Sequence, residues 1–297
     1  MASAAQVRLA FAPAMQVGEC PLWDARQAVL YWVDNVACAV HRLDPASGAH
    51  RFWPMPSEPG CIARDTTGNL IVALRTGFAR LNLADGSLTQ LAPAPYDVRS
   101  ARFNDGRCDA AGRFWVGSMY EPRDAPRAAM YCLERGTLRR HWSDITVSNG
   151  LAFSPDQRTL YHADTSAHLI RRYAFDPASG QASAPRVLRQ FSSLRDGDYG
   201  GRPDGAAVDS EGAYWCAMYE GGCLLRLSPA GEVLLRIALP LRCPTMLAFG
   251  GDDLRTLYIT SASARRPAEE LAAYPLSGCL LSVRVAVAGL AEHAYVD

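Results

Sequence analysis

The sequence predicts an all-β protein, a six-bladed β-propeller that occupies residues 1–297 as a single domain. One motif returns six times: a turn that begins near an aspartate, followed by a strand rich in aromatic and β-branched residues. The turn aspartates are Asp24, Asp65, Asp109, Asp156, Asp209 and Asp253. They are separated by 41, 44, 47, 53 and 44 residues, which is typical of the length of a propeller blade. A pair of β-sandwiches, the alternative architecture, does not explain the regular return of one motif.

The elements follow in order from this repeat. A short strand at residues 7–11 precedes the first unit, and we expect it to complete the last blade beside residues 279–287 and so close the ring. The second unit, residues 60–91, is a plain blade that lacks a polar residue where other units carry one. Residues 267–274 favour a short helical insertion in the last unit.

Composition indicates which kinds of partner and which cellular location to expect. The 30 basic and 30 acidic residues balance, which gives no reason to expect nucleic acid or an anionic membrane as a partner. No apolar run is long enough to span a bilayer, and the N-terminus lacks the pattern of a signal peptide. The nine cysteines include no C-x-x-C pair and are expected to be reduced and mostly buried. We therefore expect a cytoplasmic protein, either a monomer or a weak homo-oligomer.

Polar residues recur at one phase of the repeat. Glu19, Asn104 and Asp204 each lie five residues before their turn aspartates. Asn149 and Thr245 lie seven and eight residues before theirs, in units that share a Leu-Ala-Phe run, so the extra length belongs to the turn. The first strand of each blade lines the central channel, and equivalent positions therefore converge on the axis. The sequence thus predicts a polar cluster at one end of the channel.

Such a cluster indicates a metal site. Two carboxylates and two amides without a nearby basic pair would repel one another, and a divalent cation removes that repulsion. Oxygen ligands suit Ca²⁺, Mg²⁺ or Mn²⁺, while Zn²⁺ and Fe²⁺ stay open as alternatives. With few protein ligands, positions are left for water and substrate, as in a catalytic site. We expect Arg102 and Glu121, from the third unit, to bind a polar molecule.

The motifs GECPLW, RFNDG, VSNGLAFSPD, RPDGAAVD and FGGDDLRTLYITSA together resemble the SMP-30/gluconolactonase/LRE family of regucalcin-like sugar lactonases. The resemblance covers essentially the whole chain and implies a six-bladed propeller with one axial divalent metal. It also implies roles for six residues: metal ligands Glu19, Asn149 and Asp204, with Asp204 as general base, and substrate contacts Arg102, Asn104 and Glu121. One departure is Cys20, where the family usually has Gly; its thiol either alters the metal site or points into the core.

The function implied is hydrolysis of a sugar (aldono-)lactone to the sugar acid, in which the metal polarises the carbonyl and Asp204 activates water. The sequence contains no G-x-S-x-G elbow, which argues against a serine acyl-enzyme. Two alternatives stay open. One is a propeller hydrolase of phosphotriesters or aryl esters, and the other is a non-catalytic propeller that binds calcium or a protein partner.

Several other polar residues have two interpretations or a structural one. His162 is either a second base or a hydrogen-bonded core residue, and we expect the latter. Asp34 and Asp164 end second strands and are expected to be structural. Residues 192–201 form either a lid or a solvated loop, and residues 123–127 are expected at the mouth of the site.

Overall fold

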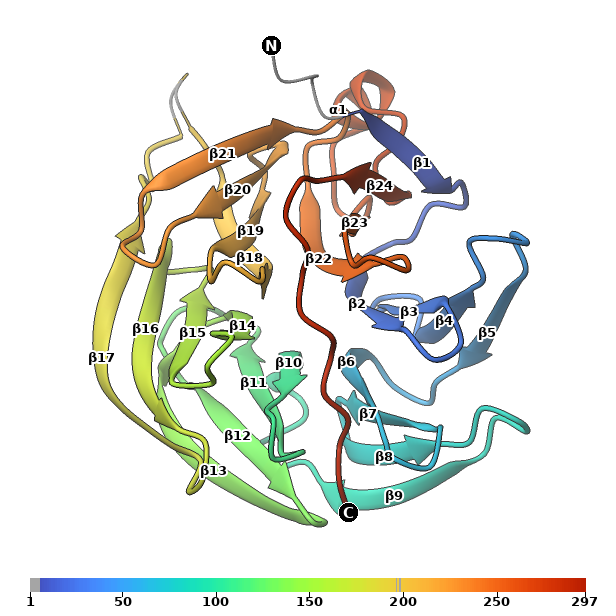
Figure 1. Cartoon of the computed structure of the whole chain (residues 1–297), viewed down its shortest axis with the longest axis vertical. Coiled ribbons are helices and arrows are strands. Elements are labelled where there is room, and N and C mark those ends of the chain that lie inside the picture. The colour runs from blue at the N-terminus through green and yellow to red at the C-terminus, as the bar shows by residue number, and fades with distance from the viewer. Residues whose placement is uncertain (1–5, 196, 198) are drawn as a thin grey trace.

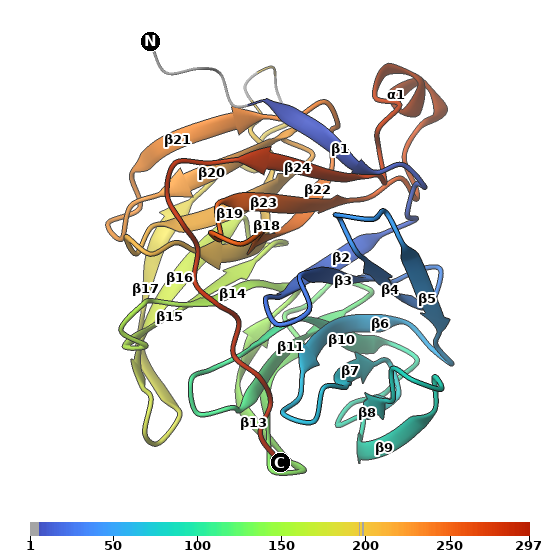
Figure 2. The same cartoon turned by 45° about the vertical axis from the view of Figure 1, so that its right-hand side comes forward.

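Six four-stranded antiparallel sheets surround a central axis in the computed structural model, which describes residues 6–195, 197 and 199–297 (Figure 1). The expectation of an all-β, six-bladed propeller is confirmed. Each of the first five blades uses four consecutive strands, with the first strand nearest the axis. The side view in Figure 2 shows the blades stacked around the axis and the short helix projecting beyond them.

The strands of the first five blades follow the repeat read from the sequence. Blades one and two contain β2 (Gly18–Asp24), β3 (Val29–Asp34), β4 (Ala39–Leu43), β5 (His50–Pro54), β6 (Pro59–Arg64), β7 (Leu70–Leu74), β8 (Gly77–Leu81) and β9 (Leu88–Pro93). Blade three contains β10 (Ala101–Cys108), β11 (Phe114–Tyr120), β12 (Ala128–Glu134) and β13 (Thr137–Ile145). Blades four and five contain β14 (Ser148–Phe153), β15 (Thr159–Asp164), β16 (Leu169–Asp176), β17 (Gln181–Gln190), β18 (Arg202–Val208), β19 (Tyr214–Tyr219), β20 (Cys223–Leu227) and β21 (Val233–Ala238).

The sixth blade joins the two ends of the chain. Its strands are β22 (Pro244–Gly250), β23 (Thr256–Ser261), β24 (Leu280–Arg284) and β1 (Val7–Phe11). The N-terminal strand pairs antiparallel with β24, with Val7 opposite Val283 and Phe11 opposite Leu280, so its predicted role in closing the ring is confirmed. The helix α1 (Ala268–Ala273) is inserted between β23 and β24, where the sequence favoured one.

The turn aspartates work as the sequence motif indicates. All six accept a hydrogen bond from the backbone N–H two residues later. Asp209 is the most fully bonded example: it also accepts from the backbone of Ala213 at 3.0 Å, Trp215 Nε1 at 2.8 Å and Arg226 Nε at 2.7 Å. The Asp209 turn is thereby fixed to the second and third strands of its own blade.

Between the blades lies a core of large side chains. The largest fully buried residues include Trp32, Trp115 and Trp215, which occupy the second strands of three different blades. Their burial removes large apolar surfaces from water and stabilises the packing of neighbouring sheets.

The C-terminal segment, residues 289–297, runs across the end of the channel where the inner strands finish (Figure 1). The backbone N–H of Tyr295 donates to Arg64 O at 2.7 Å, and the Tyr295 hydroxyl accepts from the backbone of Gly136 at 2.8 Å. Glu292 pairs with Arg107, whose guanidinium also donates to Ala206 O. This segment, the C-terminal strap, crosses the channel at that end.

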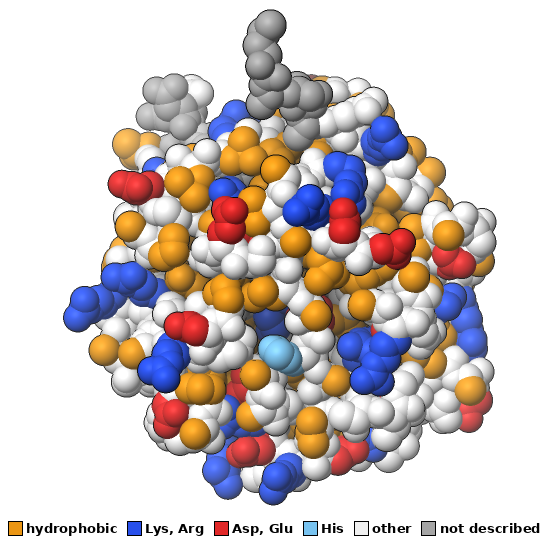
Figure 3. Space-filling model, in the orientation of Figure 1, with side chains coloured by type: hydrophobic (Ala, Val, Ile, Leu, Met, Phe, Trp, Pro, Cys, Tyr) orange, Lys and Arg blue, Asp and Glu red, His pale blue; other side chains and the backbone are white. Residues whose placement is uncertain are grey.

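Surface charge and helix length are relevant to whether nucleic acid or a membrane is a partner. Basic and acidic side chains are interspersed over the face in Figure 3, with no patch of one sign. Over the described ranges, no helix has the length and apolar character needed to cross a membrane.

Candidate active site

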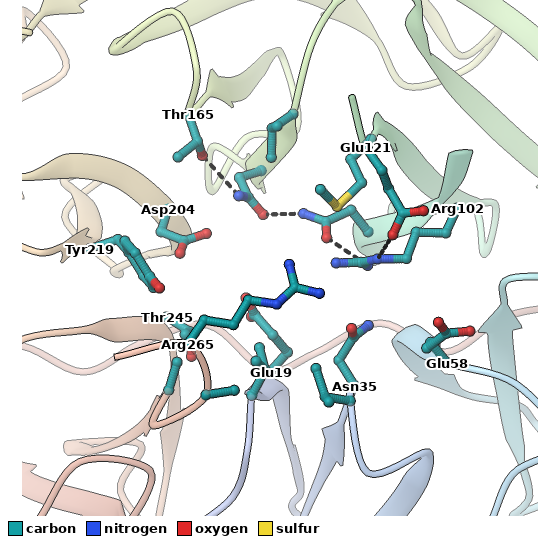
Figure 4. Close-up of a pocket in the computed structure, with 18 of the residues that line it drawn as sticks. Glu19, Asn35, Glu58, Arg102, Glu121, Thr165, Asp204, Tyr219, Thr245 and Arg265 are labelled. Carbon is teal, nitrogen blue, oxygen red and sulfur yellow. Dashed lines mark hydrogen bonds and ion pairs between the residues drawn. The ribbon is translucent and has the colours of Figure 1, made fainter. Parts of the chain in front are cut away.

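A cavity of about 570 Å³ opens at the end of the channel opposite the strap (Figure 4). It is lined from the beginnings of the inner strands and from the loops that follow the second strands. The lining includes all six residues assigned from the sequence: Glu19, Arg102, Asn104, Glu121, Asn149 and Asp204. Residues from four blades and from distant parts of the chain are therefore brought to one place.

The inner strands are irregular at these positions. The pairing register shifts between Glu19 and Leu22, between Phe103 and Gly106, between Asn149 and Ala152, and between Pro203 and Ala206. A bulge of this kind turns a side chain out of the regular alternation of a strand. The bulges thus direct the polar side chains into the cavity while the rest of each strand stays in the core.

Blade two contributes no side chain to this ring for a steric reason. The equivalent position is Gly60, where an added Cβ would lie 2.5 Å from the backbone oxygen of Phe103. Blades two and three approach so closely there that only glycine fits.

A chain of hydrogen bonds orients the amides. The Arg102 guanidinium donates to Asn104 Oδ1 at 2.9 Å, and Asn104 Nδ2 donates to Asn149 Oδ1 at 2.7 Å. Asn149 Nδ2 donates to Thr165 Oγ1 at 2.8 Å, and the threonine hydroxyl donates to Pro203 O at 2.7 Å. Each side-chain amide nitrogen therefore has a hydrogen-bond acceptor, and this determines the orientation of the amide and the position of its oxygen atom. Thr165 was not identified from the sequence, because a threonine after a strand carries no distinctive pattern.

The carboxylates lack comparable partners. Asp204 is 5% exposed, and its Oδ1 atom accepts no hydrogen bond within the described part of the chain. Burial, with a further contribution from Asp105, raises the pKa of Asp204 to about 8. Burial and the nearby Asp204 and Asp105 carboxyls also raise the pKa of Glu19 well above its usual range. A cation between these carboxyls would lower both pKa values further than the nearby Arg102 and Arg202 do.

The donors fit a hard divalent cation. Glu19 and Asp204 offer carboxylate oxygens and Asn149 an amide oxygen, the ligand types preferred by Ca²⁺ and Mg²⁺. Among the residues that the structure describes, no three His, Cys, Asp or Glu side chains cluster as a metal site. That finding is compatible with a ligand set of two acids and an amide.

On the other side of the cavity, Arg75 organises the acidic side chains. It donates to both oxygens of Glu121 at 2.8 and 2.9 Å and to both oxygens of Glu58 at 2.8 Å. Arg102 Nε lies 3.7 Å from Glu121. The hydrogen bonds from Arg75 lower the pKa of Glu121. Neither Arg75 nor Glu58 was identified from the sequence, because both lie outside the repeated positions of a blade that otherwise has a plain pattern.

The remaining candidates from the sequence, His162, Asp34 and Asp164, do not line the cavity. His162 is fully buried and bonded to Ser148 Oγ at 2.9 Å, and burial lowers its pKa to about 3. Asp34 accepts from the backbone of Gln16 at 2.8 Å, and Asp164 from the backbone of Thr146 at 2.9 Å, so both are structural as predicted.

Two loop predictions have different outcomes. Arg123, from the 123–127 segment, lines the cavity. The proposed lid at residues 192–201 includes residues 196 and 198, which lie outside the described residues, so the choice between lid and solvated loop stays a prediction.

Cys20 points into the core. Its Sγ atom accepts from the backbone N–H of Ile62 at 3.3 Å, and the residue is 3% exposed. Its φ of 46° lies in the left-handed region that glycine adopts most easily. Of the two interpretations left open, the structure therefore supports a core thiol rather than one that alters the metal site.

A closed six-bladed propeller with a polar cavity at one end of its axis is typical of a propeller that binds a small molecule. The family model described as SMP-30/Gluconolactonase/LRE-like region matches residues 17–263. The chain belongs to this family, and it is an enzyme of the lactonase class.

Relatives match over nearly the whole chain. A 6-deoxy-6-sulfogluconolactonase from Pseudomonas putida is 49% identical over 281 residues, covering 94% of both chains. Regucalcin from Danio rerio is 33% identical over 94% of this chain and 95% of its own. Among solved structures, a calcium-binding protein, regucalcin, from Agrobacterium tumefaciens superimposes with a TM-score of 0.93 at 26% identity, covering 99% of this chain and 98% of its own.

Proposed function

We propose that the protein hydrolyses a sugar lactone to the corresponding sugar acid and that the reaction depends on one divalent metal ion. The observation that carries this proposal is the buried Asp204 carboxylate, whose Oδ1 atom accepts no hydrogen bond from the described residues, beside Glu19 and Asn149 in an open cavity. The Pseudomonas putida relative is named for a sugar lactone, and the Agrobacterium tumefaciens structure is of a protein named as calcium-binding. Sugar lactones that carry a sulfonate group therefore belong to the proposed substrate class.

Glu19, Asn149 and Asp204 would hold the ion, and the identity of the ion is left among Ca, Mg, Mn, Zn and Fe. When bound, it would supply Lewis-acid polarisation of the lactone carbonyl and stabilise negative charge on that oxygen. Positive charge at this position also lowers the raised pKa of Asp204, so that its carboxylate is ionised near neutral pH and accepts a proton from the attacking water.

Arg102, Asn104 and Glu121 are the proposed substrate contacts. Arg102 and Asn104 are already joined by a hydrogen bond, and Arg75 holds both oxygens of Glu121, so all three would meet the substrate in fixed orientations. Such preorganisation reduces the entropy lost when the lactone hydroxyls are bound. We further propose a cytoplasmic enzyme whose partner is a small sugar lactone and which works as a monomer or weak homo-oligomer.

The test is to remove divalent metal with a chelator and measure the opening of glucono-1,5-lactone, corrected for its spontaneous hydrolysis, after adding back each candidate ion. We expect activity to be lost and then restored by at least one ion, with one ion bound per chain. Glu19→Ala, Asn149→Ala and Asp204→Ala should each lower the metal content. Full metal occupancy in all three variants would place the ion elsewhere, and unchanged activity after complete chelation would contradict metal dependence.

The same assay separates the other two functions. Metal binding without lactone opening would favour a non-catalytic calcium-binding or partner-binding propeller. Faster hydrolysis of an aryl ester or a phosphotriester than of any sugar lactone would favour a propeller hydrolase of those esters. The polar lining of the cavity disfavours that function.

A further inference from the structure

Arginine is the most frequent charged residue of the cavity wall. Five arginines line the cavity against four carboxylates, although the chain as a whole has no net charge. The arginines are Arg102, Arg123, Arg202, Arg265 and Arg266. The partners of these guanidinium groups determine how much positive charge is available to a ligand.

Three of the five have partners. Arg202 and Arg266 share the Glu220 carboxylate at 3.3 and 3.2 Å, and Arg266 also pairs with Glu270 at 2.6 Å. Arg102 is engaged by the side chain of Asn104 and lies near Glu121. These guanidinium groups are therefore already bonded to residues of the protein in the absence of a ligand.

Arg265 and Arg123 differ from them. Within residues 6–195, 197 and 199–297, neither guanidinium makes an ion pair or a hydrogen bond with another residue. Both residues have left-handed backbone conformations, with φ of 59° and 58°, which non-glycine residues rarely adopt. Figure 4 shows the Arg265 side chain extending from its loop into the middle of the cavity. Two unengaged positive charges are thus held at the mouth and interior of the site.

The acidic residues of the wall do not balance these two charges. Glu58 and Glu121 are both bonded to Arg75, which does not itself line the cavity, and Arg102 lies beside Glu121, so two guanidinium groups offset these two carboxylates. Glu19 and Asp204 lie at the proposed metal site, where a divalent ion offsets their charge. The cavity therefore has an excess of positive charge available to the ligand.

We propose that Arg265, assisted by Arg123, binds an anionic group on the sugar lactone, remote from the carbonyl that reacts. This inference rests on the proposed lactonase function and adds the charge of the substrate to it. A guanidinium binds the oxygens of sulfonate, phosphate or carboxylate through paired, charge-assisted hydrogen bonds. Neutral sugar lactones lack that contact and are the poorer substrates.

The experiment compares kcat/KM for glucono-1,5-lactone with kcat/KM for its analogues that carry a sulfonate, a phosphate or a carboxylate at carbon 6, using metal-saturated enzyme. We expect at least one anionic lactone to exceed the neutral one. Arg265→Ala should lower the anionic-to-neutral ratio about ten- to hundredfold, as expected for a lost hydrogen bond to a charged group. Arg265→Lys should retain part of the preference, and Arg123→Ala should lower the ratio less than Arg265→Ala.

Arg186, an exposed arginine on the outer strand β17, provides the matched control, and Arg186→Ala should leave the ratio unchanged. Added salt should weaken the preference of the wild-type enzyme by screening the charges. The three anionic analogues identify which oxyanion is preferred.

Failure of this inference is distinct from failure of the proposed function. A wild-type enzyme that opens the neutral lactone at least as well as every anionic one would overturn the inference and leave the lactonase proposal standing. Equal losses on neutral and anionic lactones in Arg265→Ala would also overturn it, since the arginine would then act on a group common to all the substrates. No opening of any lactone at saturating metal would instead count against the lactonase itself.

Discussion

The inner strand of the fifth blade has a buried aspartate near each end, and the two carboxylates differ in their hydrogen-bond partners. Asp209, at the end under the C-terminal strap, is fully buried and accepts hydrogen bonds from two backbone amides, a tryptophan and an arginine. Asp204, at the cavity end five residues earlier, is 5% exposed and has an oxygen that accepts none from the described residues.

The comparison shows what distinguishes a structural carboxylate from a functional one in the same fold. A buried charge is stable when hydrogen bonds and a counter-charge replace its water, as they do for Asp209. Asp204 lacks that replacement, and its free energy is lowered only when a cation or a proton arrives. Position in the repeat identifies both residues, but only the pattern of partners separates their roles.

The largest effect should come from exchanging each aspartate for asparagine. We expect Asp204→Asn to lower kcat by about 10²–10⁴ even at saturating metal, because a proton acceptor is lost while an oxygen ligand is kept. Asp209→Asn should instead lower the free energy of unfolding by about 1.5–3 kcal/mol through weakened bonds to Arg226 and Trp215. Steady-state kinetics and urea unfolding of both variants measure the two effects.

Near-wild-type turnover of Asp204→Asn at saturating metal would rule out Asp204 as the base, and Asp105 would be tested next. Burial raises the pKa of Asp105 to about 6, and its Oδ2 atom accepts from the backbone of Leu151 at 2.8 Å.

A smaller effect is expected from Arg102→Ala, which perturbs the cavity end without removing a proposed metal ligand. The variant loses the hydrogen bond to Asn104 and the proposed substrate contact, so kcat/KM should fall about ten- to hundredfold. Metal content should stay close to one ion per chain, as determined by elemental analysis. Loss of the ion would mean that Arg102 supports the metal site through the Asn104–Asn149 hydrogen bond.

The cavity end of this strand should also make stability depend on pH. The folded-state pKa of Asp204 is about 8, against a usual value of 3.8, so its contribution to stability is fully present below pH 3.8 and is lost as the pH rises to about 8. In the metal-free protein, the free energy of unfolding should fall more steeply over this range in the wild type than in Asp204→Asn. Bound metal should reduce the wild-type slope. Identical slopes in wild type and Asp204→Asn would contradict this account.

The smallest effect concerns the bulge beside Glu19. Cys20→Gly relieves a left-handed backbone that costs a non-glycine residue roughly 1–2 kcal/mol, but it also removes a buried side chain packed against Ile62. The two terms oppose each other, so we expect a change in the free energy of unfolding within about 1 kcal/mol and an unchanged metal content. A large loss of bound metal would show that the thiol acts on the site after all.

The repeat was sufficient to predict the six blades and the convergence of Glu19, Asn104, Asn149 and Asp204, because a propeller places equivalent strand positions around one axis. Residues outside the repeat could not be found in this way. Arg75 and Arg265 come from loops, and whether a loop side chain reaches the cavity, as Arg265 does, or a residue that lines it, as Arg75 does, depends on the path of the backbone rather than on periodicity. The direction of the Cys20 thiol was equally inaccessible, since it depends on a local bulge.

The C-terminal strap has a consequence for the order of events in turnover. Because Glu292 and Arg107 pair under the strap, at the end of the channel opposite the cavity, the lactone, water and sugar acid of the proposed reaction would all exchange through the mouth of the cavity. The acid formed in one cycle therefore leaves by the route along which the next lactone enters. A retained acid and an incoming lactone exclude each other, and the sugar acid is accordingly expected to inhibit competitively.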